Sequence, residues 1–328
     1  MAWDGLALFD LDPDWAQGQR IAERLEHPLC PFEERTFEDG ELKIRPLAGV
    51  RDKDVFVVQS LHGSPQRSVH DRLFRLLIFV GALKDCSARR VTVVAPYLAY
   101  ARKDRRTKPR DPVTTRCMAM LFEAVGTDRV VTMDVHNLAA FENAFRCRTE
   151  NLEASPLFVR HVAPLVGDEP VCVVSPDIGG VKRAERFHAS LSRALGREVG
   201  MAFLDKTRSA GVVGGGTLVG EVVGHTVIVL DDLISSGTTM LRAGEACRRQ
   251  GARRVFAMVT HGVFAPGAAH LLASPAFEGT VVTDTLAPFR LPEGAVSRRL
   301  TVLDTAPLFA EAIARLHAGG SISDLLAD

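Results

Sequence analysis

The stretch Val227–Met240, VIVLDDLISSGTTM, predicts both the fold and the ligand class of this chain. Its first four residues are apolar, which is typical of a buried parallel strand. Two acids, Asp231 and Asp232, follow this strand, and a helical pattern begins at Met240. Small residues fill the loop between the acids and the helix: Ser235, Ser236, Gly237, Thr238 and Thr239. We therefore expect a strand, a polar loop and a helix in succession.

This layout suits a phosphorylated sugar. A phosphate can bind the loop amides and hydroxyls at a helix N-terminus, where the helix dipole favours an anion. The two carboxylates can accept hydrogen bonds from neighbouring ribose hydroxyls. A simple turn with an N-cap Ser or Thr would explain only one or two of these residues. The segment resembles the loop that binds 5-phosphoribosyl 1-diphosphate (PRPP) in phosphoribosyltransferases and in PRPP synthetases, and alone it does not choose between them.

Composition excludes several protein classes. The chain has 328 residues, enough for two domains, and its 40 basic and 40 acidic residues cancel. A general nucleic-acid binder would carry a basic excess, so we expect no nucleic-acid partner. The six cysteines form no CxxC pair, which argues against a zinc site or a disulfide framework. Because no apolar run reaches the length of a membrane span and the N-terminus lacks a signal-peptide pattern, we expect a cytoplasmic protein without a membrane partner.

Apolar segments alternate with helical patterns along the chain, which predicts an α/β fold with parallel sheets. The expected strands are Leu6–Phe9, Val55–Gln59, Val91–Ala95, Val130–Met133, Val171–Ser175, Met201–Leu204, Val227–Leu230, Val255–Val259 and Val281–Thr283. The expected helices are Val69–Leu83, Thr114–Ala124, Arg183–Leu195 and Thr239–Gly251. The pattern also suggests two similar halves that meet near residues 148–156, where TENLEASPL is expected to form a polar turn. An amphipathic tail, Ala306–His317, is expected to pack on one of the halves.

Two further strand ends carry polar residues, and ligands of α/β sheets bind at that edge. The segment VVTMDVH places His136 just after a strand, where it can bind a metal or a phosphate or have only a structural role. The segment VCVVSPDIGGV ends its strand near Asp177, and Gly179 and Gly180 permit close backbone approach to a diphosphate. Asp177 can also hold Mg²⁺. A tight turn with an Asp cap is the alternative.

Three other segments combine charge with turn residues. The run Tyr97–Arg110 is dense in Lys and Arg. Such a run is most often a solvated basic loop, and RNA binding is another interpretation that the balanced net charge weakens. An electropositive flap over a polyphosphate is the more specific alternative. Lys206 and Arg208 follow a strand beside the glycine-rich loop Ser209–Gly220, so the two cations can close over a transferring phosphoryl group or be ordinary surface charges. The segment FEDGE, residues 37–41, reads as a hairpin turn or as a place where an adenine stacks on Phe37.

Together these segments resemble the ribose-phosphate pyrophosphokinase (PRPP synthetase) family nearly from end to end. The motifs run from FEDGE through APYLAYARKDRR, TMDVH, VVSPDIGGVKRA, LDKTR and LDDLISSGTT to the tail AEAIARLH. The resemblance implies two tandem phosphoribosyltransferase-like (Rossmann-like) domains, residues 1–150 and 151–328, each with a mainly parallel sheet flanked by helices. The tail helix, about 306–317, is expected to pack on the first domain. The family loop carries a further Asp and a Thr where this chain has Ser235 and Ser236.

The resemblance also implies an activity, the transfer of the β,γ-diphosphate of MgATP to ribose 5-phosphate, which gives PRPP and AMP. Its site residues fall into four groups. The resemblance implies that ATP binds Phe37, Asp39, Glu41, Arg102, Lys103, Asp104, Arg105 and His136. It implies that ribose 5-phosphate binds Asp231, Asp232, Ser235, Ser236, Gly237, Thr238 and Thr239. The implied diphosphate loop is Asp177, Gly179 and Gly180, the implied metal ligands are His136 and Asp177, and the implied catalytic cations are Lys206 and Arg208.

The adenine site is implied to lie across a subunit contact, so we expect a homo-oligomer, a dimer or larger. One competing hypothesis is a non-catalytic, PRPP-synthetase-like regulatory subunit, but such a protein would be expected to lose the metal and catalytic residues that are present here. Another is a phosphoribosyltransferase that acts on a base, which would leave the first half of the chain without a role. We therefore expect an active ribose-phosphate diphosphokinase.

Overall fold

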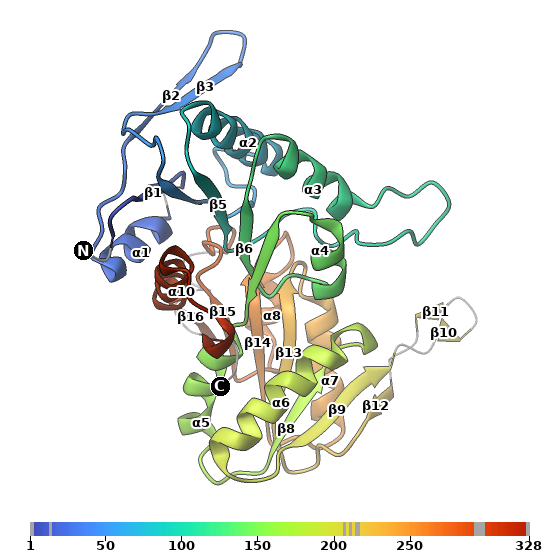
Figure 1. Cartoon of the computed structure of the whole chain (residues 1–328). Helices are drawn as coiled ribbons and strands as arrows, with labels where there is room; N and C mark the ends of the chain where they lie inside the picture. Colours follow the sequence, from blue (N-terminus) through green and yellow to red (C-terminus); the bar gives the residue numbers. More distant parts are fainter. Residues whose placement is uncertain are drawn as a thin grey trace. The chain divides into compact units, whose positions relative to one another are not determined.

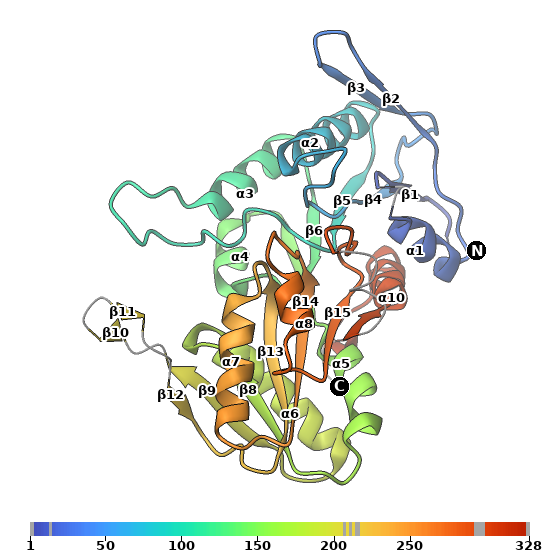
Figure 2. The same ribbon diagram turned by 180° about the vertical axis from the view of Figure 1, so that it is seen from behind.

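The structure is a computed structural model that describes residues 3–12, 15–205, 208–209, 212–213, 217–291 and 299–325. The chain divides into two compact units. Unit 1 comprises Met1–Glu153 and Thr305–Ala327, and unit 2 comprises Ala154–Asp304. Figures 1 and 2 show helices and parallel strands in both units. The predicted α/β fold class is confirmed.

Unit 1 contains a parallel sheet of five strands in the order β1-β4-β5-β6-β7. Its strands are β1 (Leu6–Asp10), β4 (Asp54–Val58), β5 (Arg90–Ala95), β6 (Arg129–Met133) and β7 (Arg148–Leu152). A separate antiparallel hairpin is formed by β2 (Phe32–Thr36) and β3 (Leu42–Pro46). The helices are α1 (Gln17–Leu25), α2 (Val69–Asp85), α3 (Thr114–Ala124), α4 (Leu138–Ala144) and α10 (Ala306–Ala318), with a short 3₁₀ helix η2 (Ser323–Leu325).

Strand alternation builds the core of unit 1. In β1, Ala7 and Phe9 belong to a buried cluster with Phe79 of α2 and Phe122 of α3. Because side chains of a strand alternate between its two faces, the intervening residues, such as Leu8, face the other side of the sheet. Leu8 is also fully buried, so both faces are covered, as is usual for a parallel sheet.

The tail folds as helix α10 and packs on α1. The helix buries one face that includes Phe309 and Ile313. A hydrogen bond of 2.9 Å from Gln17 Nε2 to Thr305 Oγ1 joins the starts of the two helices. Segments almost 300 residues apart in sequence therefore belong to the same unit, as Figure 1 shows for the blue and red helices.

The prediction of a polar turn in TENLEASPL is wrong. Residues Arg148–Leu152 form β7, which pairs in parallel with β6 and lies at the edge of the sheet. An edge strand pairs on one side only, and its polar residues remain partly solvated, so its sequence lacks a strong apolar pattern. Helix α5 (Ser155–Val166) begins shortly after it, in unit 2.

Unit 2 contains a sheet of seven strands in the order β12-β9-β8-β13-β14-β15-β16, in which only β12 is antiparallel to its neighbour. Its strands are β8 (Val171–Ser175), β9 (Gly200–Asp205), β12 (Thr217–Val219), β13 (Thr226–Ile234), β14 (Arg254–Gly262), β15 (Gly279–Thr283) and β16 (Leu300–Leu303). Besides α5, its helices are η1 (Ile178–Gly180), α6 (Val181–Leu195), α7 (Thr238–Arg249) and α8 (Ala269–Ala273). Figures 1 and 2 show α5 and α6 on one face and α7 and α8 on the other.

The order of this sheet creates a switch point between β8 and β13. From β8 the chain passes to β9 on one side, and it later returns to β13 on the other side. Ligands of open α/β sheets bind outside the carboxyl ends of the strands at such a point. The loops after β8 and β13 therefore flank the expected ligand position within unit 2.

Strand β13 is longer than the sequence pattern suggested. Asp231 and Asp232 lie inside the strand rather than after it, and pairing with β14 continues to Leu233 and Ile234. A short antiparallel hairpin of β10 (Arg208–Ser209) and β11 (Val212–Val213) begins just before the glycine-rich segment and extends into it. Among the described residues, no helix has the length and apolar character needed to cross a membrane.

Asp10 ends β1 in a buried position, and its carboxylate accepts a hydrogen bond of 2.8 Å from the Asp12 backbone N–H. Burial raises the pKa of this carboxyl from 3.8 to about 6. The folded state therefore favours the protonated form, and the stability of unit 1 should fall as the pH rises from about 4 to about 6. A shift of this size corresponds to about 3 kcal/mol.

We expect Asp10→Asn to remove this part of the pH dependence of unfolding. Urea unfolding followed by tryptophan fluorescence reports on unit 1, because Trp3 and Trp15 both lie in it. The wild-type free energy of unfolding should decline between pH 4 and pH 6 more steeply than that of the variant. Parallel curves for the two proteins would contradict the assignment.

Candidate functional site

Two neighbouring acids lie near the carboxyl end of β13 in unit 2. The Asp232 backbone N–H donates a hydrogen bond of 2.9 Å to Asp231 Oδ1. Arg183 of α6 reaches both carboxylates, with its Nη1 atom 3.4 Å from Asp231 Oδ1 and 3.4 Å from Asp232 Oδ1. The Asp232 residue is only 3% exposed. The guanidinium of Arg183 thus balances part of a concentrated negative charge.

The pKa of Asp231 is raised, first because the carboxyl is buried and second because Asp232 lies beside it. The positive charge of Arg183 opposes this rise. A buried acid pair of this kind is strongly sensitive to the ligand that contacts it, because a hydroxyl donor satisfies the charged form in place of water. The arrangement suits the binding of a sugar diol.

The loop after β13 leads directly into α7. Gly237 precedes the first helical residue with φ of 81°, a left-handed conformation that favours glycine. The Ser236 and Thr238 hydroxyls lie 3.1 Å apart, and Ser236 and Thr238 are both exposed. The first N–H groups of a helix lack partners within the helix. The loop therefore presents hydroxyls and helix N–H groups, which is the chemistry of a phosphate site.

The neighbouring strand β8 ends in a second polar loop. Asp177 caps η1 by accepting a hydrogen bond of 3.2 Å from the Gly180 N–H. A Cβ atom on Gly180 would lie 2.8 Å from Ser175 Oγ, so a larger residue here would require the Ser175 side chain to move. Because β8 and β13 pair directly, the Asp177 loop and the loop of Ser235–Thr239 follow adjacent strands. The structure thus brings both predicted loops to the same edge of one sheet.

The predicted catalytic cations follow β9, the other neighbour of β8. This strand ends at Asp205. Lys206 lies outside the described residues, and Arg208 is described only as the first residue of the β10 strand. The predicted roles of these two cations therefore stay predictions.

In unit 1, the basic run forms the long connection between β5 and α3. Arg102 and Arg105 are exposed, whereas Lys103 is held inside the loop. Its ammonium forms an ion pair with Asp111 and donates a hydrogen bond of 2.7 Å to Thr107 Oγ1. Side-chain hydrogen bonds from Lys103 and Thr107, together with Lys108 and Thr107 amides, hold the pKa of Asp111 well below its usual range. The contacts of Lys103 hold the flap together from within. Arg102 and Arg105 are the exposed cations of the flap.

His136 lies between β6 and α4, at the carboxyl edge of the unit 1 sheet, and is exposed. Two contacts fix its backbone surroundings. The Val135 N–H donates to Asn151 Oδ1 at 2.8 Å, and Asn137 caps α4 by accepting from the Ala140 N–H. Asn137 Nδ2 also donates to Asp104 Oδ2 at 2.5 Å, which joins the His136 loop to the flap. The structure therefore brings two of the predicted ATP segments together.

The FEDGE segment is the tip of the β2–β3 hairpin, as predicted. The Phe37 N–H donates to the Glu41 carbonyl at 2.8 Å, and the Glu41 N–H donates to Asp39 Oδ1 at 3.0 Å. The guanidinium carbon of Arg35 lies 4.8 Å from the centroid of the Phe37 ring. Figure 1 shows this hairpin extending away from the unit 1 sheet. The tip therefore has room to contact a molecule outside its own unit.

Sequence reasoning missed three residues that organise these loops: Arg183, Asp111 and Asn137. Arg183 lies in the segment GGVKR, three residues after Gly180, and a cation at the start of a helix that follows a phosphate-type loop was an available signal. Asp111 and Asn137 carried no such signal, because their partners are known only from the fold. Among the described residues, no group of three or more His, Cys, Asp or Glu side chains is placed to hold a metal ion.

Comparison with known proteins gives matches over nearly the whole chain. A family model for the N-terminal domain of ribose phosphate pyrophosphokinase matches residues 6–126, and a model for the phosphoribosyl synthetase-associated domain matches residues 211–327. A ribose-phosphate pyrophosphokinase of Caldanaerobacter subterraneus subsp. tengcongensis is 37% identical over 98% of both chains. One of Ralstonia nicotianae is 35% identical over 100% of both chains.

A solved structure gives the same result. The crystal structure of phosphoribosylpyrophosphate synthetase from Mycobacterium smegmatis has a TM-score of 0.85 and 33% sequence identity, and the match covers 96% of this chain and 100% of that chain. The similarity therefore extends over both units.

Proposed function

Because the chain belongs to the ribose-phosphate pyrophosphokinase family, we propose that it transfers the β,γ-diphosphate of ATP to the 1-hydroxyl of ribose 5-phosphate, giving PRPP and AMP. The observation that carries this proposal is the switch point of unit 2. There the acid pair lies in the carboxyl half of β13, and the hydroxyl loop before α7 and the Asp177 loop follow the adjacent strands β13 and β8. The PRPP that this reaction forms serves nucleotide biosynthesis.

Ribose 5-phosphate is the proposed ligand of β13 and the loop after it. Asp231 and Asp232 accept hydrogen bonds from the 2- and 3-hydroxyls of the ribose, which places the 1-hydroxyl toward the β8 loop. The 5-phosphate lies on the residues between β13 and α7, at the N-terminus of that helix. The residues of this phosphate loop are Ser235, Ser236, Gly237, Thr238 and Thr239.

The diphosphate is the proposed ligand of Asp177, Gly179 and Gly180. Because Gly180 has no side chain, its backbone is open to close approach. A partly exposed carboxylate such as Asp177 fits Mg²⁺, which binds few protein ligands and keeps substrate phosphates in its coordination sphere. When bound, Mg²⁺ neutralises phosphate charge. His136 is proposed to bind a metal ion and a phosphate.

ATP is the proposed ligand of the flap, the His136 loop and the hairpin tip. Arg102 and Arg105 offer exposed guanidinium groups to the phosphates, while Lys103 and Asp104 hold the flap in place. Phe37, Asp39 and Glu41 bind adenine in a second copy of the chain. The functional form is thus a homo-oligomer, a dimer or larger, and the proposed location is the cytoplasm.

The reaction is an in-line transfer. The ribose 1-oxygen attacks the β-phosphorus of ATP, the bond from this phosphorus to the α,β-bridging oxygen breaks, and AMP leaves with that oxygen. The proton of the 1-hydroxyl passes to solvent. Such a step needs positioning and charge neutralisation more than covalent help from the protein. Lys206 and Arg208 are the proposed cations that stabilise the charge of the transferring group.

The test measures both products. Purified protein with ribose 5-phosphate, ATP and Mg²⁺ should form AMP and PRPP in equal amounts, detected by chromatography and by a coupled phosphoribosyltransferase. The measurement is repeated over a range of phosphate concentrations, so that a requirement for phosphate does not hide activity. Failure to form AMP under all these conditions would favour a regulatory subunit without catalytic activity.

A further inference from the structure

The β2–β3 hairpin forms a sheet of its own, separate from the five-stranded sheet of unit 1. A hairpin of two strands is only marginally stable by itself in water, so contacts with the rest of the unit have to hold it. Strand β3 lies close to α2, and Figures 1 and 2 both show the hairpin beside this helix. The direction of the hairpin thus depends on the side chains that it turns toward α2.

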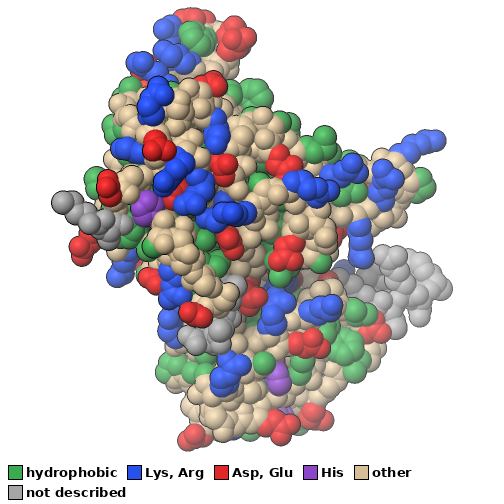
Figure 3. Space-filling model, viewed as in Figure 1, with side chains coloured by type: hydrophobic (Ala, Val, Ile, Leu, Met, Phe, Trp, Pro, Cys, Tyr) green, Lys and Arg blue, Asp and Glu red, His purple; other side chains and the backbone are tan. Residues whose placement is uncertain are grey.

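The pairing of β2 with β3 gives the hairpin an inner and an outer face. Glu34 lies opposite Ile44, and cross-strand partners of this kind point to the same side. Ile44 belongs to the buried core of unit 1, so Glu34 is on the inner face. Glu33 and Arg45 lie opposite each other on the outer face, where they form an exposed ion pair at 2.6 Å. Figure 3 shows such acidic and basic side chains on the outside of the projecting hairpin.

Two arginines from different segments pair with Glu34. Arg67, in the loop before α2, places Nη1 2.7 Å from Oε1 of the glutamate. Arg75, within α2, places Nε 2.6 Å and Nη2 2.5 Å from Oε2. The side chains of Glu34 and Arg75 are 15% and 4% exposed. Burial alone would raise the pKa of Glu34, but the two arginines outweigh it and lower this pKa. We name Glu34, Arg67 and Arg75 the hairpin anchor.

Arg75 is itself fixed by the body of unit 1. Its Nη1 atom donates a hydrogen bond to the Leu11 carbonyl, directly after β1. Its guanidinium carbon lies 5.5 Å from the centroid of the Phe32 ring at the start of β2. Nearby on α2, Arg72 pairs with Asp12 at 2.6 Å. The hairpin anchor therefore ties β2 to α2 and to the end of β1. Because it holds the two carboxylate oxygens separately, it restricts the rotation of the hairpin as well as its distance from α2.

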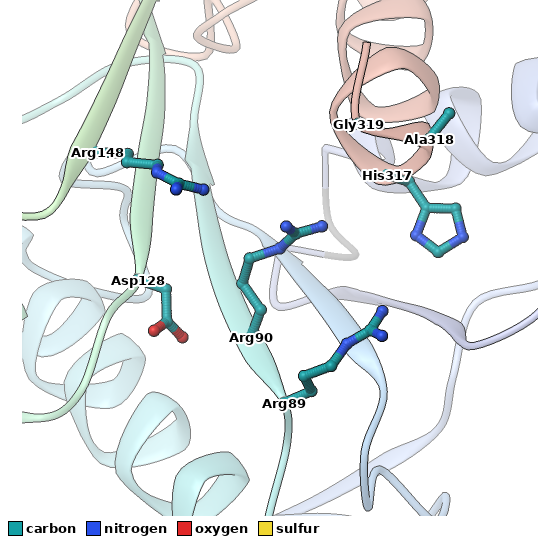
Figure 4. A pocket seen from close by; sticks show the side chains of 7 residues that line it. All are labelled: Arg89, Arg90, Asp128, Arg148, His317, Ala318 and Gly319. Carbon is teal, nitrogen blue, oxygen red and sulfur yellow. The ribbon is translucent and has the colours of Figure 1, made fainter.

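The hairpin anchor is distinct from another group of arginines in unit 1. Figure 4 shows Arg89, Arg90 and Arg148 around a cavity at the amino edge of the sheet. The acid partner of Arg90 in that group is Asp54. No residue of the hairpin anchor lines this cavity. The two groups are thus separate sets of charges, and the anchor can be altered without changing the cavity.

We propose that Glu34 is a positioning residue, which through the hairpin anchor directs the tip of the hairpin toward ATP bound in a second copy of the chain. This inference rests on the proposed function, in which Phe37, Asp39 and Glu41 bind adenine across a subunit contact. Phe37 lies three residues beyond Glu34, about 10 Å along an extended strand. A tilt of about 10° at Glu34 therefore moves the tip by about 2 Å, and an error of about 1 Å is enough to impair a binding geometry.

Amide hydrogen exchange tests whether Glu34 holds the hairpin, independently of any activity. Glu34→Gln keeps the shape of the side chain and removes its charge. Exchange in the peptides of β2 and β3 should become faster by at least about tenfold, because a buried ion pair that loses one charge is strongly destabilised. The matched control is Glu33→Gln on the same strand, which removes the exposed pair with Arg45 and should exchange as the wild type does.

Steady-state kinetics test whether the position of the tip matters for ATP. Glu34→Gln should raise the KM for ATP by at least about tenfold, because fewer hairpins occupy the competent position. The kcat at saturating ATP and the KM for ribose 5-phosphate should match those of the wild type and of Glu33→Gln. A purely structural loss of active enzyme would instead lower kcat. Arg67→Ala, at the more exposed end of the anchor, should shift the KM for ATP in the same direction and serves if Glu34→Gln does not fold.

Mixed oligomers test which copy the hairpin serves. Chains with Glu34→Gln and chains with Lys206→Ala carry different affinity tags and are purified as mixed assemblies. A site with intact Lys206 can then receive an intact hairpin from the other chain, so part of the AMP formation should regain the wild-type KM for ATP.

Two results would overturn the inference while the wild type still forms AMP. One is a KM for ATP that is unaltered in both Glu34→Gln and Arg67→Ala. The other is a raised KM that mixed assembly never restores, because the hairpin would then serve its own chain. Failure of the wild type to form AMP would contradict the proposed function instead, and with it the role of the hairpin toward ATP. Hydrogen exchange would still decide whether Glu34 holds the hairpin.

Discussion

Lys206→Ala is expected to lower kcat by about 10²–10³-fold, while the KM values for ribose 5-phosphate and ATP change little. The reason is that a cation placed at the transferring diphosphoryl group interacts most strongly where charge develops in the transition state. Lys206 follows directly on β9, which ends at Asp205 beside the β8 and β13 pair. Steady-state kinetics with AMP detection give both parameters.

The control for this prediction is Arg160→Ala, which removes an exposed cation from α5 in the same unit. Its kinetic constants should match those of the wild type. A Lys206→Ala enzyme with unchanged kcat and a raised KM would mean that Lys206 binds substrate in the ground state only. The catalytic role would then pass to Arg208 or to the flap arginines, and the corresponding alanine variants would show which.

Phe309→Ala is expected to destabilise unit 1 by about 3–5 kcal/mol, the range for removal of a large aromatic from a packed core. Phe309 is fully buried on α10, whose partner is α1. If α10 is part of the fold of unit 1, replacing Phe309 should lower the free energy of unfolding as much as replacing a buried aromatic residue elsewhere in the core of that unit. Urea unfolding, followed by the fluorescence of Trp3 and Trp15, measures the loss.

Leu47→Ala gives the comparison for this stability prediction. Leu47 is 54% exposed and also lies in unit 1, so its replacement should change the free energy of unfolding by less than about 0.5 kcal/mol. If Phe309→Ala has an equally small effect, then α10 is not part of the cooperative unit. The tail would in that case dock on a domain that folds without it.

The sequence predicted the strands that are buried on both faces. Runs such as Val171–Ser175 and Val91–Ala95 are apolar throughout, and only a central parallel strand explains such a run in an α/β chain. Helix α3 also has the predicted bounds, Thr114–Ala124. Strands β7, β12 and β16 were not among the expected strands, and they are partly exposed and carry polar residues. Their pairing partners, not their own patterns, make them strands.

The candidate site divides in the same way. The polar residues that follow apolar runs were visible in the sequence, because the end of an apolar run is a local feature. Asp177 and His136 follow their strands, and Asp231 follows the apolar part of β13. The contact of Arg183 with the acid pair was not visible, since it joins α6 to β13 across 48 positions. The ion pair between Lys103 and Asp111 was missed for another reason. A run of charges does not reveal which of its members pair with one another.

By itself, the sequence determined the α/β class and the family to which the chain belongs, and it predicted the strand ends after which the site loops are expected. All three depend on local order along the chain, such as apolar periodicity, turn residues and motif spacing. The tertiary structure alone decided that the switch point lies between β8 and β13, that the tail completes unit 1, and that Glu34 of the hairpin pairs with Arg67 and Arg75. These are long-range contacts, and their formation depends on strand order and helix packing rather than on any single segment.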